Sequence, residues 1–117
     1  MKDDVLTDGV RATRLVPDVH LIPGFWGIDG YSGISKMILD NFELKPGHYL
    51  EFPYDWRRDL RVAARQLGER VEPLLAADPD ARLVLVAHSL GGLVARSYLE
   101  CLDGWKRARR LVSFGTP

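Results

Sequence analysis

Short apolar runs alternate with longer amphipathic stretches along most of the chain, and the two kinds of segment predict different elements. Short runs rich in β-branched and aromatic side chains are typical of strands. They occur at residues 19–22, 49–52, 82–87 and 111–114. Between them, apolar residues recur three and four positions apart, which predicts helices at residues 35–42, 59–75 and 90–102. Because strands that alternate with helices wind into a parallel sheet with helices on both faces, the predicted fold class is α/β.

Two of these segments carry the clearest signals. Asp59 is a suitable N-cap for the helix expected at residues 59–75. The run at residues 82–87 is apolar without interruption after Arg82, which is typical of a strand covered on both faces. We therefore expect it to be the central strand. The apolar face of the long helix is expected to comprise Leu60, Ala64, Leu67, Val71 and Leu74.

The end of this central strand carries the candidate chemistry. Residues 87–92 read A-H-S-L-G-G, which places Ser89 between a strand and a helix. The pattern G-x-S-x-G marks a sharp turn on which a strained serine exposes its Oγ as a nucleophile. Ala87 replaces the first glycine and is still small, and Gly91 keeps the second. We therefore predict Ser89 as the catalytic residue, on an elbow formed with Ala87, His88 and Gly91.

Attack by a serine also needs N–H donors for the oxyanion that forms. The backbone N–H of Leu90 is one candidate, because unpaired amides and the helix dipole favour negative charge at a helix N-terminus. The second donor is expected from the loop P-G-F-W-G at residues 23–27, at the N–H of Phe25. The alternative is that Ser89 merely caps a helix. Its position after an apolar strand favours the nucleophile.

The chain resembles the α/β-hydrolase superfamily, and within it the lecithin:cholesterol acyltransferase-like branch of lipases and acyltransferases. The stretches that carry the likeness are L-I-P-G-F-W at residues 21–26, F-P-Y-D-W-R at 52–57, residues 87–96 and F-G-T-P at 114–117. The resemblance implies a three-layer sandwich, and hydrolysis or acyl transfer on lipid-like esters through an acyl-serine, with no cofactor or metal. It also suggests substrate contacts at Trp26 and Trp56. Asp55 and Arg57 are better interpreted as a local ion pair or helix cap.

The other members of a catalytic triad are not evident. In such enzymes the acid and then the histidine follow the serine. After Ser89 the only carboxylates are Glu100 and Asp103, and no histidine follows. We therefore expect residues 1–117 to be the N-terminal part of one α/β-hydrolase domain, without its later strands or its triad acid and histidine. Two hypotheses stay open: part of a serine esterase, lipase or O-acyltransferase, or an inactive remnant that pairs through an open sheet edge.

Composition and charge exclude other classes. Sixteen basic residues offset 16 acidic ones, so there is no net charge to attract nucleic acid. Neither G-x-G-x-x-G nor a P-loop lysine is present, which argues against a nucleotide-binding sheet. The longest apolar run is far shorter than the roughly 20 residues that span a bilayer. With a single cysteine, Cys101, and no secretory signal at the start, we expect a cytoplasmic protein.

Overall fold

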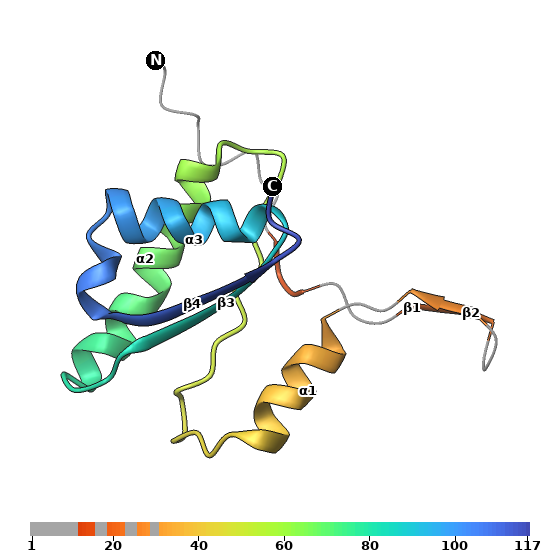
Figure 1. Ribbon diagram of the computed structural model, residues 1–117, viewed down its shortest axis with the longest axis horizontal. Coiled ribbons are helices and arrows are strands. Elements are labelled where there is room, and N and C mark those ends of the chain that lie inside the picture. Colours follow the sequence, from red (N-terminus) through yellow and green to blue (C-terminus); the bar gives the residue numbers. More distant parts are fainter. Residues whose placement is uncertain (1–11, 16–18, 23–25, 29–30) are drawn as a thin grey trace. The chain divides into compact units, whose positions relative to one another are not determined.

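The computed structural model describes residues 12–15, 19–22, 26–28 and 31–117 (Figure 1). These residues form two compact units. One comprises the described residues of 12–53, and the other comprises residues 54–117. Each unit is described by itself.

The unit at residues 12–53 contains a hairpin and a helix. Strand β1 (Val19–Ile22) pairs antiparallel with β2 (Trp26–Ile28), and helix α1 (Ser32–Asn41) follows. The first predicted strand is therefore confirmed, but its partner is the next segment and not a strand of a parallel sheet. The sequence W-G-I at residues 26–28 has an aromatic and a β-branched residue, both of which favour strands. Because glycines lie in and around this segment, the sequence had suggested a loop there.

The strand expected at residues 49–52 is not formed, so this prediction is wrong. A strand needs a neighbour to accept and donate backbone hydrogen bonds, and this segment has no ladder partner among the described residues. The segment forms side-chain hydrogen bonds instead. Glu51 Oε1 accepts hydrogen bonds from Ser35 Oγ at 2.7 Å and from Tyr49 Oη at 3.2 Å.

The unit at residues 54–117 is a parallel strand pair with helices. Its elements are α2 (Leu60–Ala77), β3 (Leu83–His88), α3 (Leu90–Cys101), the 3-10 helix η1 (Gly104–Arg107) and β4 (Ala108–Phe114). β3 and β4 are parallel, with Leu85 opposite Leu111. Asp59 caps α2 as expected, because its side chain accepts a hydrogen bond from the Arg61 N–H at 2.9 Å. No helix in the described part of the chain is both long and apolar enough to cross a bilayer.

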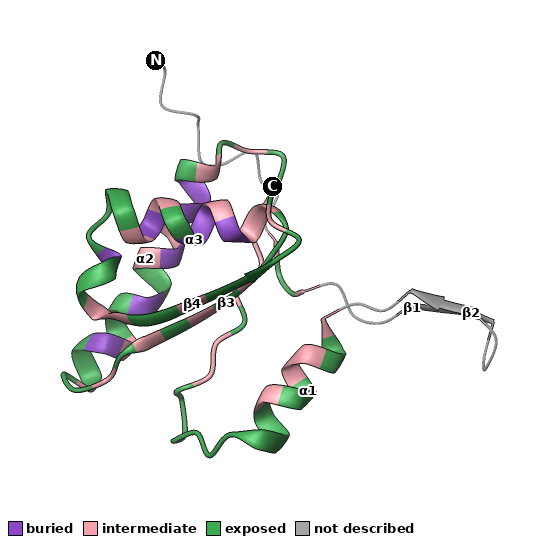
Figure 2. Ribbon diagram, in the orientation of Figure 1, coloured by how far each residue is buried: buried purple, intermediate pink, exposed green. Residues whose placement is uncertain are grey.

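The core of this unit lies where α2 packs against α3 (Figure 2). Ala64, Leu67 and Val71 are buried as the helical spacing predicts. Leu60 and Leu74 were also expected to be buried but are only half-buried, and Leu75 is buried instead of Leu74. Among the residues that the structure describes, the buried apolar side chains are Val62, Ala63, Ala64, Leu67, Val71, Leu75, Val94, Ala95 and Tyr98. All of them lie on α2 or α3, so the two helices supply the core on which the strand pair rests.

Within residues 54–117 the helices cover one face of the strand pair, which corrects the expected burial of the central strand on both faces. β3 alternates between half-buried and exposed residues. On its open face, Val84 and Val86 are 56% and 44% exposed, and Val112 of β4 is 43% exposed. An uninterrupted apolar strand such as β3 is typical of a strand covered on both faces. In this unit, however, the helices pack against one face of the strand pair. The described unit is thus mixed α/β with a two-stranded parallel sheet, and β4 is the strand paired to β3 within it.

Candidate active site

Ser89 lies at the sharp turn between β3 and α3, where the sequence placed it. Its backbone has φ 52° and ψ −127°, and few side-chain-bearing residues adopt a positive φ. Such a conformation costs of order 1–3 kcal/mol and persists only where the surrounding structure enforces it. The side chain makes no capping hydrogen bond, and the residue is exposed. Ser89 is thus the N-cap residue of α3, but its hydroxyl does not cap the helix, so the alternative in which the side chain serves as a cap is not supported. The placement between a strand and a helix is confirmed.

Three hydrogen bonds hold the strained turn. The Ser89 N–H donates to the Phe114 carbonyl at 3.0 Å. The Ser89 carbonyl accepts from the Gly92 N–H at 3.0 Å and from Thr116 Oγ1 at 2.9 Å. Two of these bonds come from residues 114–116, which we call the clamp. The chain turns at Gly115, where φ is 61° and only glycine avoids strain, so that the clamp can reach back to the serine.

The elbow requires a glycine at position 92 more than at position 91. A Cβ added at Gly92 would lie 2.7 Å from Thr116 Cγ2 and 2.9 Å from Thr116 Cβ, which is too close for any real contact. A Cβ added at Gly91 would meet Tyr54 Oη at 3.6 Å and Ala87 Cβ at 3.8 Å, which are ordinary contacts. The pattern had singled out Gly91. The doublet G-G and the tract F-G-T-P were the signals that could have revealed Gly92 and Thr116.

His88 is directed toward the strand pair's open face. Its ring centroid lies 5.1 Å from that of Phe114, and the two residues are opposite each other in the β3–β4 ladder. Successive side chains of a strand point to opposite faces. His88 thus shares the face of Val84 and Val86, which agrees with the expectation that it is not the base acting on Ser89.

Of the two predicted oxyanion donors, Leu90 lies within the described residues and Phe25 does not. Leu90 is the first residue of α3, and the first N–H groups of an α-helix have no partner within the helix. Its backbone is therefore suited to bind an anion beside Ser89. Phe25 lies outside the described residues. Trp26, which was expected in the same loop, instead lies in β2. The roles of Phe25 and Trp26 stay predictions.

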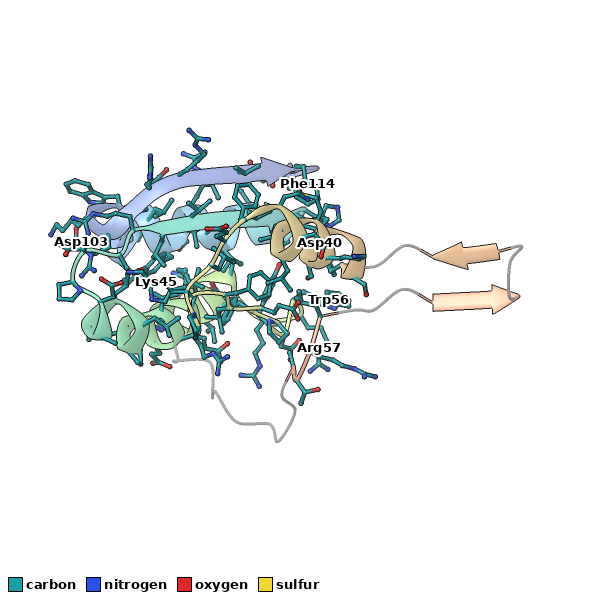
Figure 3. All side chains as sticks on the ribbon, turned by 90° about the horizontal axis from the view of Figure 1, so that it is seen from below. Asp40, Lys45, Trp56, Arg57, Asp103 and Phe114 are labelled. Carbon is teal, nitrogen blue, oxygen red and sulfur yellow. The ribbon has the colours of Figure 1, made fainter. Side chains whose placement is uncertain are left out.

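The tract after Pro53 lies beside the elbow. Tyr54 Oη is the nearest atom to a Cβ built at Gly91, so the two motifs that carry the resemblance meet within one unit. Trp56 is 72% exposed (Figure 3), which leaves its indole accessible to a ligand. Its contact with substrate stays a prediction.

Asp55 and Arg57 form the local ion pair that the sequence favoured. Arg57 donates from Nε to Asp55 Oδ1 at 2.8 Å and from Nη2 to Oδ2 at 2.6 Å, and its backbone N–H donates to Oδ1 at 3.1 Å. The side-chain hydrogen bonds from Arg57 lower the pKa of Asp55 to about 2. The carboxylate is therefore ionised at physiological pH and already occupied by its neighbour.

The two carboxylates that follow Ser89 are not placed to act as a triad acid. Glu100 is ion-paired with Arg96 at 2.7 Å, and Asp103 is ion-paired with Lys106 at 2.9 Å. Glu100 belongs to the last turn of α3, while Ser89 precedes the first. At a rise of about 1.5 Å per residue, roughly 16 Å of helix separates the two. A base and its orienting acid for Ser89 do not come from these residues.

Comparison with known proteins identifies the family. The family model for lecithin:cholesterol acyltransferase matches residues 30–117. An uncharacterized protein of the yeast Saccharomyces cerevisiae is 30% identical over 86 residues, which is 72% of this chain and 13% of the yeast protein. The chain thus spans a small part of that relative's length. No solved structure matches the chain. The matched range contains the elbow, the clamp and the tract beside them, and the chain belongs to the lecithin:cholesterol acyltransferase family.

Proposed function

We propose that this chain supplies the nucleophile of a serine-dependent esterase or acyltransferase that acts on lipid-like esters. The observation that carries the proposal is the conformation of Ser89. Its positive φ and exposed hydroxyl follow a strand and precede a helix N-terminus, within the range that matches the family. That is the arrangement a nucleophilic serine requires.

The proposed reaction proceeds through an acyl-serine. Ser89 Oγ bonds to the ester carbonyl carbon while its proton passes to a general base. The carbonyl oxygen becomes an oxyanion, and the Leu90 N–H donates to it. The alcohol then leaves with the proton returned by the base, and water or another hydroxyl takes the acyl group. Losing one oxyanion donor typically lowers the rate by about 10²–10³-fold, so the Leu90 amide would be a large contributor.

We propose that the base and its orienting acid are contributed by polypeptide outside these 117 residues. Two observations support this. No histidine follows Ser89, and both later carboxylates are ion-paired near the far end of α3. The same proposal assigns the later strands and the second helix layer of an α/β-hydrolase sandwich to that polypeptide, which would cover the open face at Val84 and Val86.

A fluorophosphonate probe tests the proposed nucleophile directly when it is applied to the protein that includes the polypeptide proposed to supply the base and its orienting acid. Ser89 Oγ displaces fluoride from phosphorus, so an O–P bond forms, the P–F bond breaks and the hydroxyl proton is released. We expect the adduct to map to Ser89 by mass spectrometry and to be lost in Ser89→Ala. Ser113→Ala is the matched control, because Ser113 is an exposed serine in ordinary strand backbone and its removal should leave labelling intact. Labelling that survives Ser89→Ala would contradict the proposal.

A second candidate is an inactive member of the family that acts by pairing with another chain. The observation that favours it is the exposed strand pair: among the described residues β3 and β4 bond only to each other, and Val86 and Val112 on their open face are exposed. Unpaired strand edges are ready templates for association. This candidate predicts no labelling of Ser89 together with a mass above the monomer by light scattering.

A further inference from the structure

We propose that Thr116 is a positioning residue for the oxyanion donor at Leu90. This inference rests on the proposed function and adds to it a residue that neither the nucleophile pattern nor the family match assigns. Thr116 acts through the peptide bond between Ser89 and Leu90 and does not touch the substrate.

The peptide bond between Ser89 and Leu90 links the orientation of the Ser89 carbonyl to that of the Leu90 N–H. The Ser89 carbonyl and the Leu90 N–H belong to one planar trans unit, in which the C=O and N–H bonds point in opposite directions. Fixing the carbonyl oxygen therefore fixes the direction of the N–H. An oxyanion donor is effective only when it is aimed in advance at the place where charge develops. Any group that holds the Ser89 carbonyl consequently orients the proposed donor.

Thr116 is one of two groups that hold this carbonyl. A carbonyl oxygen has two lone pairs, and here the Gly92 N–H takes one at 3.0 Å while Thr116 Oγ1 takes the other at 2.9 Å. The bond from Gly92 closes a local turn and moves with the helix N-terminus. Thr116 lies 27 residues away and follows β4, so its bond ties the peptide to the sheet.

The position of Thr116 is itself constrained by packing. The glycine at position 92 leaves the space that its side chain fills, as the 2.7 Å approach of a Cβ built there to Thr116 Cγ2 shows. The clamp also holds the other side of the serine, because the Phe114 carbonyl accepts the Ser89 N–H. The hydroxyl of Thr116 thus reaches the Ser89 carbonyl from a half-buried side chain that fills the space over Gly92 and follows a strand end.

Matched variants separate the hydroxyl from the methyl group. Thr116→Val keeps the shape and removes the donor, while Thr116→Ser keeps the donor and removes the methyl group. Without the donor, we expect the second-order rate of fluorophosphonate labelling at Ser89 to fall by about five- to tenfold, the scale of one modest hydrogen bond. We expect Thr116→Ser to stay within about twofold of the wild type. Thermal unfolding of each variant establishes that the comparison is made on folded protein.

A second measurement keeps this inference separate from the proposed function. In ¹H–¹⁵N spectra, Thr116→Val should shift the Leu90 amide resonance, while the amide of Val71 in the α2 core stays unchanged. If wild type is not labelled but the Leu90 amide responds as stated, the proposed function fails and the positioning role stands. If Thr116→Val is labelled at the wild-type rate, or if it lowers only the melting temperature and leaves the Leu90 amide unmoved, the positioning role is overturned.

Discussion

Replacing Gly92 with alanine puts a methyl group where the side chain of Thr116 already lies. The added Cβ would meet Thr116 Oγ1 first, and it would lie 2.7 Å from Thr116 Cγ2 and 2.9 Å from its Cβ. Thr116 must therefore move by roughly 0.8 Å or more to restore ordinary carbon–carbon contact near 3.5–4.0 Å. That movement pulls Oγ1 away from the Ser89 carbonyl, with which it now forms a hydrogen bond at 2.9 Å. The strained turn at Ser89 would lose one of the bonds that enforce it.

The expected cost can be worked out from three contributions. Overpacking costs typically about 1–3 kcal/mol, and loss of the Thr116 hydrogen bond adds about 1 kcal/mol. Against these, alanine is favoured over glycine inside a helix by up to about 1 kcal/mol, and Gly92 lies in α3. We therefore expect Gly92→Ala to lower the free energy of unfolding by about 1–4 kcal/mol.

Urea unfolding of two neighbouring variants provides the assay. Gly91→Ala is the matched control, because its Cβ would meet only ordinary contacts at 3.6 and 3.8 Å, and we expect it to be neutral or stabilising. In a double-mutant cycle, Gly92→Ala should lower the free energy of unfolding by less in the Thr116→Gly background than in the wild type, because the obstructing side chain has been removed. Equal stability of Gly92→Ala and Gly91→Ala, or strict additivity in the cycle, would refute the packing argument.

Two further predictions concern the unit's stability. Arg107 Nη2 donates to the carbonyls of Leu75, Asp78, Pro79 and Ala81 at 3.1–3.2 Å, so Arg107→Met should lower the free energy of unfolding in urea by about 1–3 kcal/mol. Arg109→Met, at an exposed position of β4, should change it by less than about 0.5 kcal/mol, and equal effects would contradict this account. The pKa of Asp55 is about 2 in the folded chain, below its value of about 3.9 when unfolded, so its stabilising effect is present above pH 4 and lost as pH falls toward 2. The stability gap between wild type and Asp55→Asn should narrow over that range in acid titrations, and a gap independent of pH would rule out the ion pair as its source.

Local signals in the sequence predicted the second unit well. The helix spacing from Asp59 onward, the apolar run before His88 and the small residues after Ser89 each gave an element close to its observed bounds. These features depend on neighbours a few residues apart. The buried face of α2 differs from the prediction at both ends of the helix, where Leu60 and Leu74 are only half-buried and their neighbours Val62, Ala63 and Leu75 are buried. Only the packing against α3 sets this helical phase.

The failures concern contacts between distant segments. The composition of residues 49–52 suits a strand, but a strand exists only with a partner, and none pairs with it among the described residues. The apolar run of β3 predicted cover on both faces, but Val84 and Val86 are exposed, because the sequence of one strand does not specify which segments pack against it. Thr116 was missed for the same reason, because its bond to Ser89 spans 27 residues and only the fold brings the two together.

The crystal structure of the protein, including the polypeptide proposed to supply the base, after reaction with a fluorophosphonate tests the central claim most directly. We predict phosphorus bonded to Ser89 Oγ, with the serine still at positive φ and one phosphonyl oxygen about 2.7–3.1 Å from the Leu90 backbone nitrogen. Phosphorus on another residue, or on a Ser89 that has relaxed to negative φ with its phosphonyl oxygens turned away from Leu90, would contradict it.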